Sequence, residues 1–167
     1  MSCESSWGES SVPYNVTVTK CLFDGTSQTL NYENNTKYAA VAVEGLGSGG
    51  VGKEVNVTAE TIPCKNITIT NNVFRNVPNN YYVTVSAAQN VTIMNNVFES
   101  RSTDNAKKVG KAIYVNGCMD ICISNNTYSE FANGDLTNVI VGNNYKNLYG
   151  TDVEGVFETN KEPETAN

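Results

Sequence analysis

The sequence contains no histidine, only four prolines, little basic charge and no long apolar run. Without histidine, and with no cysteine pair at the spacing of a zinc site, it predicts no metal-binding residues. No segment approaches the roughly 18 apolar residues that indicate a membrane-spanning helix. With 11 basic and 17 acidic residues the net charge is −6, which argues against nucleic acid and anionic membranes as partners.

What the chain does have is a repeated stretch, Asn-Ile-Thr-Ile-Thr-Asn-Asn-Val-Phe at 66–74. It returns at 90–98 and 120–128, with an early copy at 15–23 and a decayed copy at 138–145. The copies that start at 66, 90, 120 and 138 lie 24, 30 and 18 positions apart. Fixed motifs at such spacings are typical of stacked units that cannot bury an apolar face alone.

Each copy predicts a strand and a bend. Its first part alternates β-branched and polar residues, which is the period of a half-buried strand. Two asparagines follow, and because asparagine tolerates a left-handed backbone, they predict a sharp bend. A second strand precedes the motif, as at 82–89 and 112–119. Since each strand would meet its equivalent in the next unit, we expect parallel sheets.

Alternation also predicts which side chains face inward. The asparagine pairs should bond from unit to unit through their amides. Cys64 and Cys118 should lie two units apart, roughly 10 Å and too far for a disulfide. Arg75 beside Glu99 should form an exposed ion pair. Three inward stacks are expected, namely Val16, Ile67, Val91, Ile121 and Val139; Val18, Ile69, Ile93, Ile123 and Val141; and Phe23, Phe74, Phe98 and Tyr128.

The repeat resembles those of the right-handed parallel β-helix family, the pectate-lyase-like and polygalacturonase-like superfamily, over roughly 15–145. This resemblance implies an all-β solenoid with three sheets and an internal asparagine ladder, here of about four to six coils. We expect the β-helix domain at 15–157, a leading or capping segment at 1–14 and a disordered tail at 158–167. The chain would be a fragment of a longer helix whose missing coils stack on it. No signal peptide is visible, and the resemblance implies a secreted or cell-surface protein.

The strand face before each motif carries the candidate binding site, because long insertions flank it and function usually sits on such loops. In the resembled family this face forms the polysaccharide groove. Tyr82 and Tyr114 would stack on sugar rings, and Arg101 would neutralise an acidic sugar. Thr84, Ser86 and Asn116 would supply hydrogen bonds. The expected outward columns are Ala40, Tyr82 and Ala112; Ala42, Thr84 and Tyr114; and Glu44, Ser86 and Asn116.

Catalysis is the open question. Hydrolysis of a glycoside usually needs two carboxylates about 5–10 Å apart. Glu44 lies on the predicted face, and Asp104 in the loop 99–111 is the expected second group. The paired aspartates of polygalacturonase-like enzymes and a lyase-like set of acidic calcium ligands are not visible. One hypothesis is part of a secreted glycoside hydrolase or polysaccharide lyase, with no cofactor unless a lyase-like site takes calcium. The other is a non-catalytic glycan-binding, structural or adhesive β-helix.

Overall fold

The computed structural model describes residues 2–4, 12–25, 39–45, 58–76, 81–100, 111–129, 131, 139–155 and 157. These residues form strands and turns and no helix, which confirms the all-β class. The strands are β1 (Ser2–Glu4), β2 (Tyr14–Thr19), β3 (Leu22–Asp24), β4 (Val41–Glu44), β5 (Cys64–Thr70), β6 (Val73–Arg75), β7 (Val83–Ser86), β8 (Ala88–Met94), β9 (Val97–Glu99), β10 (Ile113–Ser124), β11 (Thr127–Ser129) and β12 (Ile140–Tyr149).

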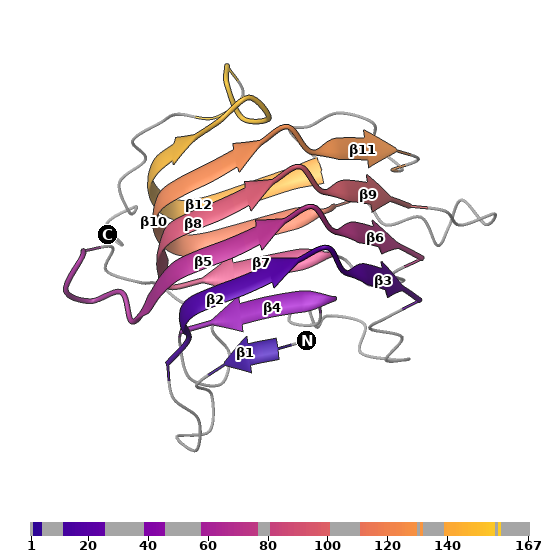
Figure 1. The fold of residues 1–167 in the computed structure, drawn as a ribbon. Helices are drawn as coiled ribbons and strands as arrows, with labels where there is room; N and C mark the ends of the chain where they lie inside the picture. Colours follow the sequence, from indigo (N-terminus) through magenta and orange to yellow (C-terminus); the bar gives the residue numbers. More distant parts are fainter. Residues whose placement is uncertain are drawn as a thin grey trace, which may run out of the picture.

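The strands pair in parallel, as expected, and form two curled sheets (Figure 1). The larger sheet has the order β1-β4-β7-β10-β8-β5-β2, and the smaller one β11-β9-β6-β3. β10 is long enough to belong to both arms of the larger sheet, because its first residues pair with β7 and its last with β8. β12 follows β10 along both halves. The sheet therefore turns back on itself at β10.

The register confirms the equivalence of the repeats except for the last copy. Val16 pairs with Ile67, Ile67 with Val91, and Val91 with Ile121. The next residue in this row is Leu148, so the prediction of Val139, and of a repeat at 138–145, is wrong.

The error has a physical reason. Residues 140–145 pair with 113–118, the strand that precedes the motif. Their asparagine Asn144 has a φ of 46°, and Gly117 at the equivalent bend has 62°. Both bends need a residue with a left-handed backbone conformation. Asn143 and Asn144 therefore look like the asparagine pair of the motif, although they belong to a different bend.

The inward stacks make up the main core. Phe23, Phe74, Phe98 and Tyr128 stack as predicted, with successive ring centroids 4.8, 5.0 and 5.4 Å apart. The spacing follows from the distance between neighbouring strands, about 4.8 Å. Beside this stack lie the apolar rows that begin at Val16 and Val18. Each fully buried side chain contributes on the order of 1.5–3 kcal/mol before conformational entropy is counted.

The asparagine pairs perform two different tasks. The first asparagine of each pair makes the bend, with φ values of 57° at Asn71, 56° at Asn95 and 55° at Asn125. The second points inward and forms the predicted ladder. Asn72 Nδ2 donates to Asn96 Oδ1 at 3.0 Å, and Asn96 Nδ2 to Asn126 Oδ1 at 2.9 Å. The amides also donate to backbone carbonyls, as Asn96 Nδ2 does to Ile69 O.

The ladder ends on groups of two different kinds. At its start the backbone N–H of Cys21 donates to Asn72 Oδ1, so Cys21 stands where later units have the inward asparagine. At its other end the buried Asp152 accepts from Asn126 Nδ2 at 2.7 Å and from Tyr128 Oη at 2.8 Å, both through Oδ2. The same oxygen accepts from the Asn126 backbone N–H. A carboxylate suits this place because it accepts three donors and brings none of its own.

One predicted ion pair has a different partner. Asp24, Arg75 and Glu99 lie in one column, as expected. The ion pair that the structure contains joins Arg75 Nη2 to Asp24 Oδ2 at 2.8 Å, on the opposite side from Glu99. Both side chains are about one third exposed, so the pair contributes about 0–1 kcal/mol.

Replacing Asp152 by alanine should lower the free energy of unfolding by about 2–4 kcal/mol, because three buried or half-buried donors lose their acceptor. Asp152→Asn should cost less, since an amide oxygen can still accept from Asn126. Urea denaturation measures both changes. Glu154→Ala, an exposed acid in the same turn, is the matched control and should change stability by less than about 0.5 kcal/mol. Equal losses for Asp152→Ala and Glu154→Ala would contradict this role of Asp152.

Candidate functional site

The predicted outward rows exist. β4, β7 and the first half of β10 lie side by side, so Glu44, Ser86 and Asn116 occupy one row. The parallel row contains Ala42, Thr84 and Tyr114. We call these two rows together the polar face. Val83 and Val85 between them are fully buried in the main core, which confirms the predicted register.

The exposure predicted for the polar face is wrong. Thr84 and Ser86 are 0% exposed, Asn116 is 1%, Glu44 4% and Tyr114 5%. A second apolar cluster explains part of this burial, because Ala39 and Tyr81 pack with Tyr114 outside the main core. Alternation fixes the face on which a side chain lies, and it does not fix whether that face is covered.

Tyr82 is not on the polar face. Its ring lies in the main core, 6.0 Å from that of Phe98 and edge-on to Phe131 at 5.7 Å. Its hydroxyl donates to the carbonyl of Glu99 at 2.7 Å. The whole predicted column faces inward, since Ala40 and Ala112 belong to the same core. These residues precede the first paired residue of their strands, so the alternation of the strands does not extend to them.

The remaining predicted site residues, Asp104 and Arg101, lie outside the described residues. Their assignment as a second carboxylate and as a cation for an acidic sugar stays a prediction. Trp7 in the leading segment and the tail at 158–167 also lie outside the described residues.

Aromatic rings lie at the polar face, and one of them, Tyr81, was not among the predicted site residues. Tyr81 and Tyr114 have ring centroids 5.2 Å apart at 50°, and the Nζ of Lys111 lies 5.8 Å from the Tyr81 ring centre. Burial, followed by the neighbouring Tyr114, raises the pKa of Tyr81 to about 12. The exposed Asn143 reaches the face from β12, where its Nδ2 donates to Tyr114 Oη at 3.4 Å.

Two hydroxyl groups of the polar face have no hydrogen-bond partner. They are Thr84 Oγ1 and Ser86 Oγ, both fully buried on β7. A buried hydroxyl without a partner costs about 1–3 kcal/mol, and such groups are uncommon in native proteins. The two residues are separated by Val85 alone, so both hydroxyls belong to the same side of one short strand. Both hydroxyl groups are 0% exposed, so a hydroxyl-rich molecule would supply the missing partners only after the side chains that cover this face move aside.

The sequence analysis also missed a strand at the edge of the larger sheet. β1 pairs with β4, and Glu4 lies opposite Glu44 in the register. Neighbouring Cα atoms in such a pair are about 4.8 Å apart. The strand has three residues, which is too short for a periodic pattern to reveal it.

The described residues contain no group of three or more cysteine, aspartate or glutamate side chains arranged to hold a metal. Within the same residues, no helix is long and apolar enough to cross a membrane.

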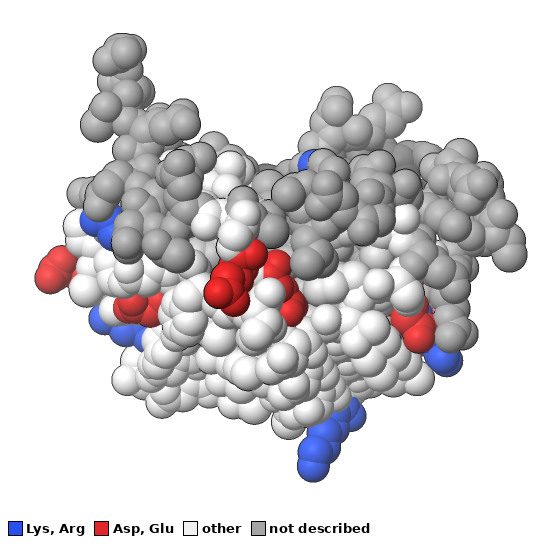
Figure 2. All heavy atoms as spheres, turned by 90° about the horizontal axis from the view of Figure 1, so that it is seen from above, with Lys and Arg blue, Asp and Glu red and all other residues white. Residues whose placement is uncertain are grey.

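Figure 2 looks down on the orange and yellow end of Figure 1. On the described surface in this view, charged side chains are few, and the basic ones lie at the periphery. Comparison of the chain with family models, curated proteins and solved structures finds no match in any of the three.

The cysteines give a direct test of the core. Cys64 and Cys118 are buried and free, as predicted, whereas Cys21 is exposed. Burial raises the pKa of the Cys118 thiol from its ordinary value of 9.0 to about 12. Alkylation by iodoacetamide at pH 8 should therefore be at least about 100-fold slower at Cys118 than at Cys21, since only the thiolate reacts. Mass mapping of the labelled peptides measures the ratio.

The same pKa shift sets the dependence of stability on pH. The unfolded chain loses the Cys118 proton near pH 9 and the folded chain near pH 12. The stability due to this group is therefore complete below pH 9 and declines between pH 9 and 12. Labelling of Cys118 as fast as Cys21 in the native protein, or a Cys64–Cys118 disulfide, would contradict the assigned core.

Proposed function

We propose that the chain is a right-handed parallel β-helix from a secreted or cell-surface carbohydrate-active protein, and that its polar face binds an oligosaccharide. The solenoid is supported by the order of the pairings. β4, β5 and β6 pair with β7, β8 and β9 in turn, and those pair with β10 and β11. Stacked units of this kind, joined by right-handed crossovers, form a β-helix.

One observation carries the proposed binding. Thr84 Oγ1 and Ser86 Oγ are buried without a partner, and they lie between Glu44 on one side and Tyr114 and Asn116 on the other. A sugar offers hydroxyls that both donate and accept, so it can pair with a hydroxyl, a carboxylate and an amide together.

Thr84→Val is the sharpest test, because it removes a hydroxyl and keeps the shape of the side chain. In the free protein it should raise the free energy of unfolding by about 1 kcal/mol, since no hydrogen bond is lost. It should also weaken binding of the oligosaccharide roughly five- to tenfold, because one hydrogen bond to the ligand is lost. Denaturation and calorimetric titration with a hit from a glycan array measure the two effects.

Thr92→Val on β8 is the matched control, because Thr92 is half-buried and lies outside the polar face. It should change neither quantity appreciably. A Thr84→Val protein that is less stable than the original, or that binds as tightly, would contradict the proposal. An array without a hit would refute the binding and leave a structural solenoid.

Hydrolysis is the second candidate function, because Glu44 places a carboxylate in the row with Ser86 and Asn116. Retaining glycosidases place two carboxyl groups about 5–5.5 Å apart, one as nucleophile and one as acid and base. In this hypothesis Glu44 is one of the pair and Asp104 is the second, as predicted from the sequence.

Glu44→Gln should abolish any turnover of the oligosaccharides that bind, because it removes a carboxylate that the reaction needs and keeps the size of the side chain. Release of reducing ends from array hits measures turnover. Glu60→Gln, an exposed acid in the turn before β5, is the control. Product from the Glu44→Gln protein at an undiminished rate would exclude Glu44 as a catalytic residue. Binding without product from either protein would favour the non-catalytic alternative.

A further inference from the structure

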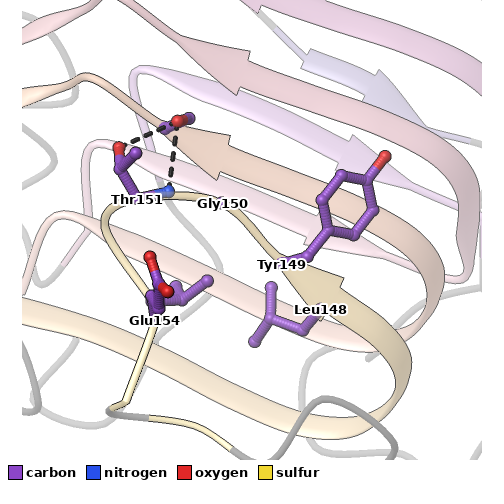
Figure 3. A pocket seen from close by; sticks show the side chains of 7 residues that line it. Leu148, Tyr149, Gly150, Thr151 and Glu154 are labelled. Carbon is purple, nitrogen blue, oxygen red and sulfur yellow. Dashed lines mark hydrogen bonds between the residues drawn. The ribbon is translucent and has the colours of Figure 1, made fainter.

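A cavity of about 390 Å³ lies where the larger sheet ends. Figure 3 shows Leu148 and Tyr149 at the end of β12, with their side chains on opposite sides of the strand, and Thr151 and Glu154 in the following turn. We call this cavity the end pocket. It is separate from the polar face, because it involves the second half of β12 and the end of β10 rather than their first halves.

The wall of the end pocket is rigid. Thr151 Oγ1 lies 2.8 Å from Ser124 Oγ and accepts from the Asn125 backbone N–H at 2.9 Å. Gly150 has a φ of 120°, and a Cβ there would clash with the carbonyl of Ile123. Asp152 anchors the next position of the turn to the asparagine ladder. The turn is thus held in place before any ligand arrives.

The two walls differ in chemistry. Tyr149 is 51% exposed, so its ring is accessible to a ligand, whereas Leu148 is 1% exposed and belongs to the main core. The opposite wall offers the exposed carboxylate of Glu154 and the hydroxyl group of Thr151. An apolar ring face opposite hydrogen-bonding groups suits a sugar ring, whose C–H face is apolar and whose edge carries hydroxyls. The volume lies within the range of small-molecule sites, about 300–1,000 Å³.

The acidic residues at the end pocket favour a ligand without negative charge. Glu154 lines the end pocket, Asp152 lies two residues before it, and none of the described residues that line the pocket is basic. Like charges in such a place repel, so a sugar acid would be disfavoured. A carboxylate also accepts two hydrogen bonds from neighbouring hydroxyls of a neutral ring.

We propose that the end pocket binds one neutral pyranose ring, stacked on Tyr149 and hydrogen-bonded to Glu154. This site is independent of the oligosaccharide proposed for the polar face. It takes a single ring, because its walls come from one end of one sheet rather than from a row of successive units.

Saturation-transfer NMR on the whole chain, with methyl β-glucoside, methyl β-galactoside and glucuronate as probes, tests the proposal. At least one methyl glycoside should bind, and glucuronate should bind at least tenfold more weakly. Tyr149→Ala should raise the Kd roughly tenfold, and Glu154→Gln severalfold. Tyr14→Ala removes an equally accessible tyrosine, 61% exposed at the opposite end of the same sheet, and should have no effect. Thr84→Val should also leave this binding unchanged.

Several results would overturn the assignment. They are no saturation by either methyl glycoside, equal binding of glucuronate, or equal losses in the Tyr149→Ala and Tyr14→Ala proteins. Binding of tetramethylammonium in place of both glycosides would show that the end pocket is a site for organic cations. Loss of glycoside binding in Thr84→Val would show that the signal comes from the polar face.

Discussion

The whole structure depends on how the chain turns a corner without losing hydrogen bonds. A bend between two strands takes backbone groups out of the sheet, and inside the protein no water replaces their partners. The inward asparagines solve this problem, because each amide has two donors and an acceptor. Asn72 and Asn96, both 1% exposed, bond to each other and to the carbonyls of Val18 and Ile69. An apolar residue at these places would leave several groups unpaired, so the bend fixes both the residue and the stacking.

This constraint explains how much of the fold could be predicted from the sequence. The motif is visible because the ladder position tolerates few other residues and because the strands beside it alternate. The last unit was assigned wrongly for the same reason, since Asn143 and Asn144 serve a different bend. The true end of the ladder is Asp152, which needs only to accept and therefore carries no asparagine pair to mark it.

The candidate site was predictable in one respect and unpredictable in another. Alternation placed Glu44, Ser86 and Asn116 in one row, because the face to which a side chain points depends only on its position along its own strand. Burial of the neighbouring row, at Tyr114, depends on Ala39 and Tyr81, which precede their strands and follow no alternation. Tyr82 shows the same limit. It precedes β7 by one residue, and its side chain faces inward although the alternation of the strand would point it outward.

The parallel register also argues that the two proposed sites suit ligands of different shape. On the polar face, Glu44, Ser86 and Asn116 come from successive units at about 4.8 Å per step, so their row is straight and as long as the stack. A straight row of fixed groups complements an extended chain of sugars. β7 lies between β4 and β10, so Thr84 and Ser86 are held on both sides and cannot rotate their backbone to find partners within the protein. The end pocket belongs to the second half of β12, where the turn after Gly150 closes one side and a cavity of about 390 Å³ remains.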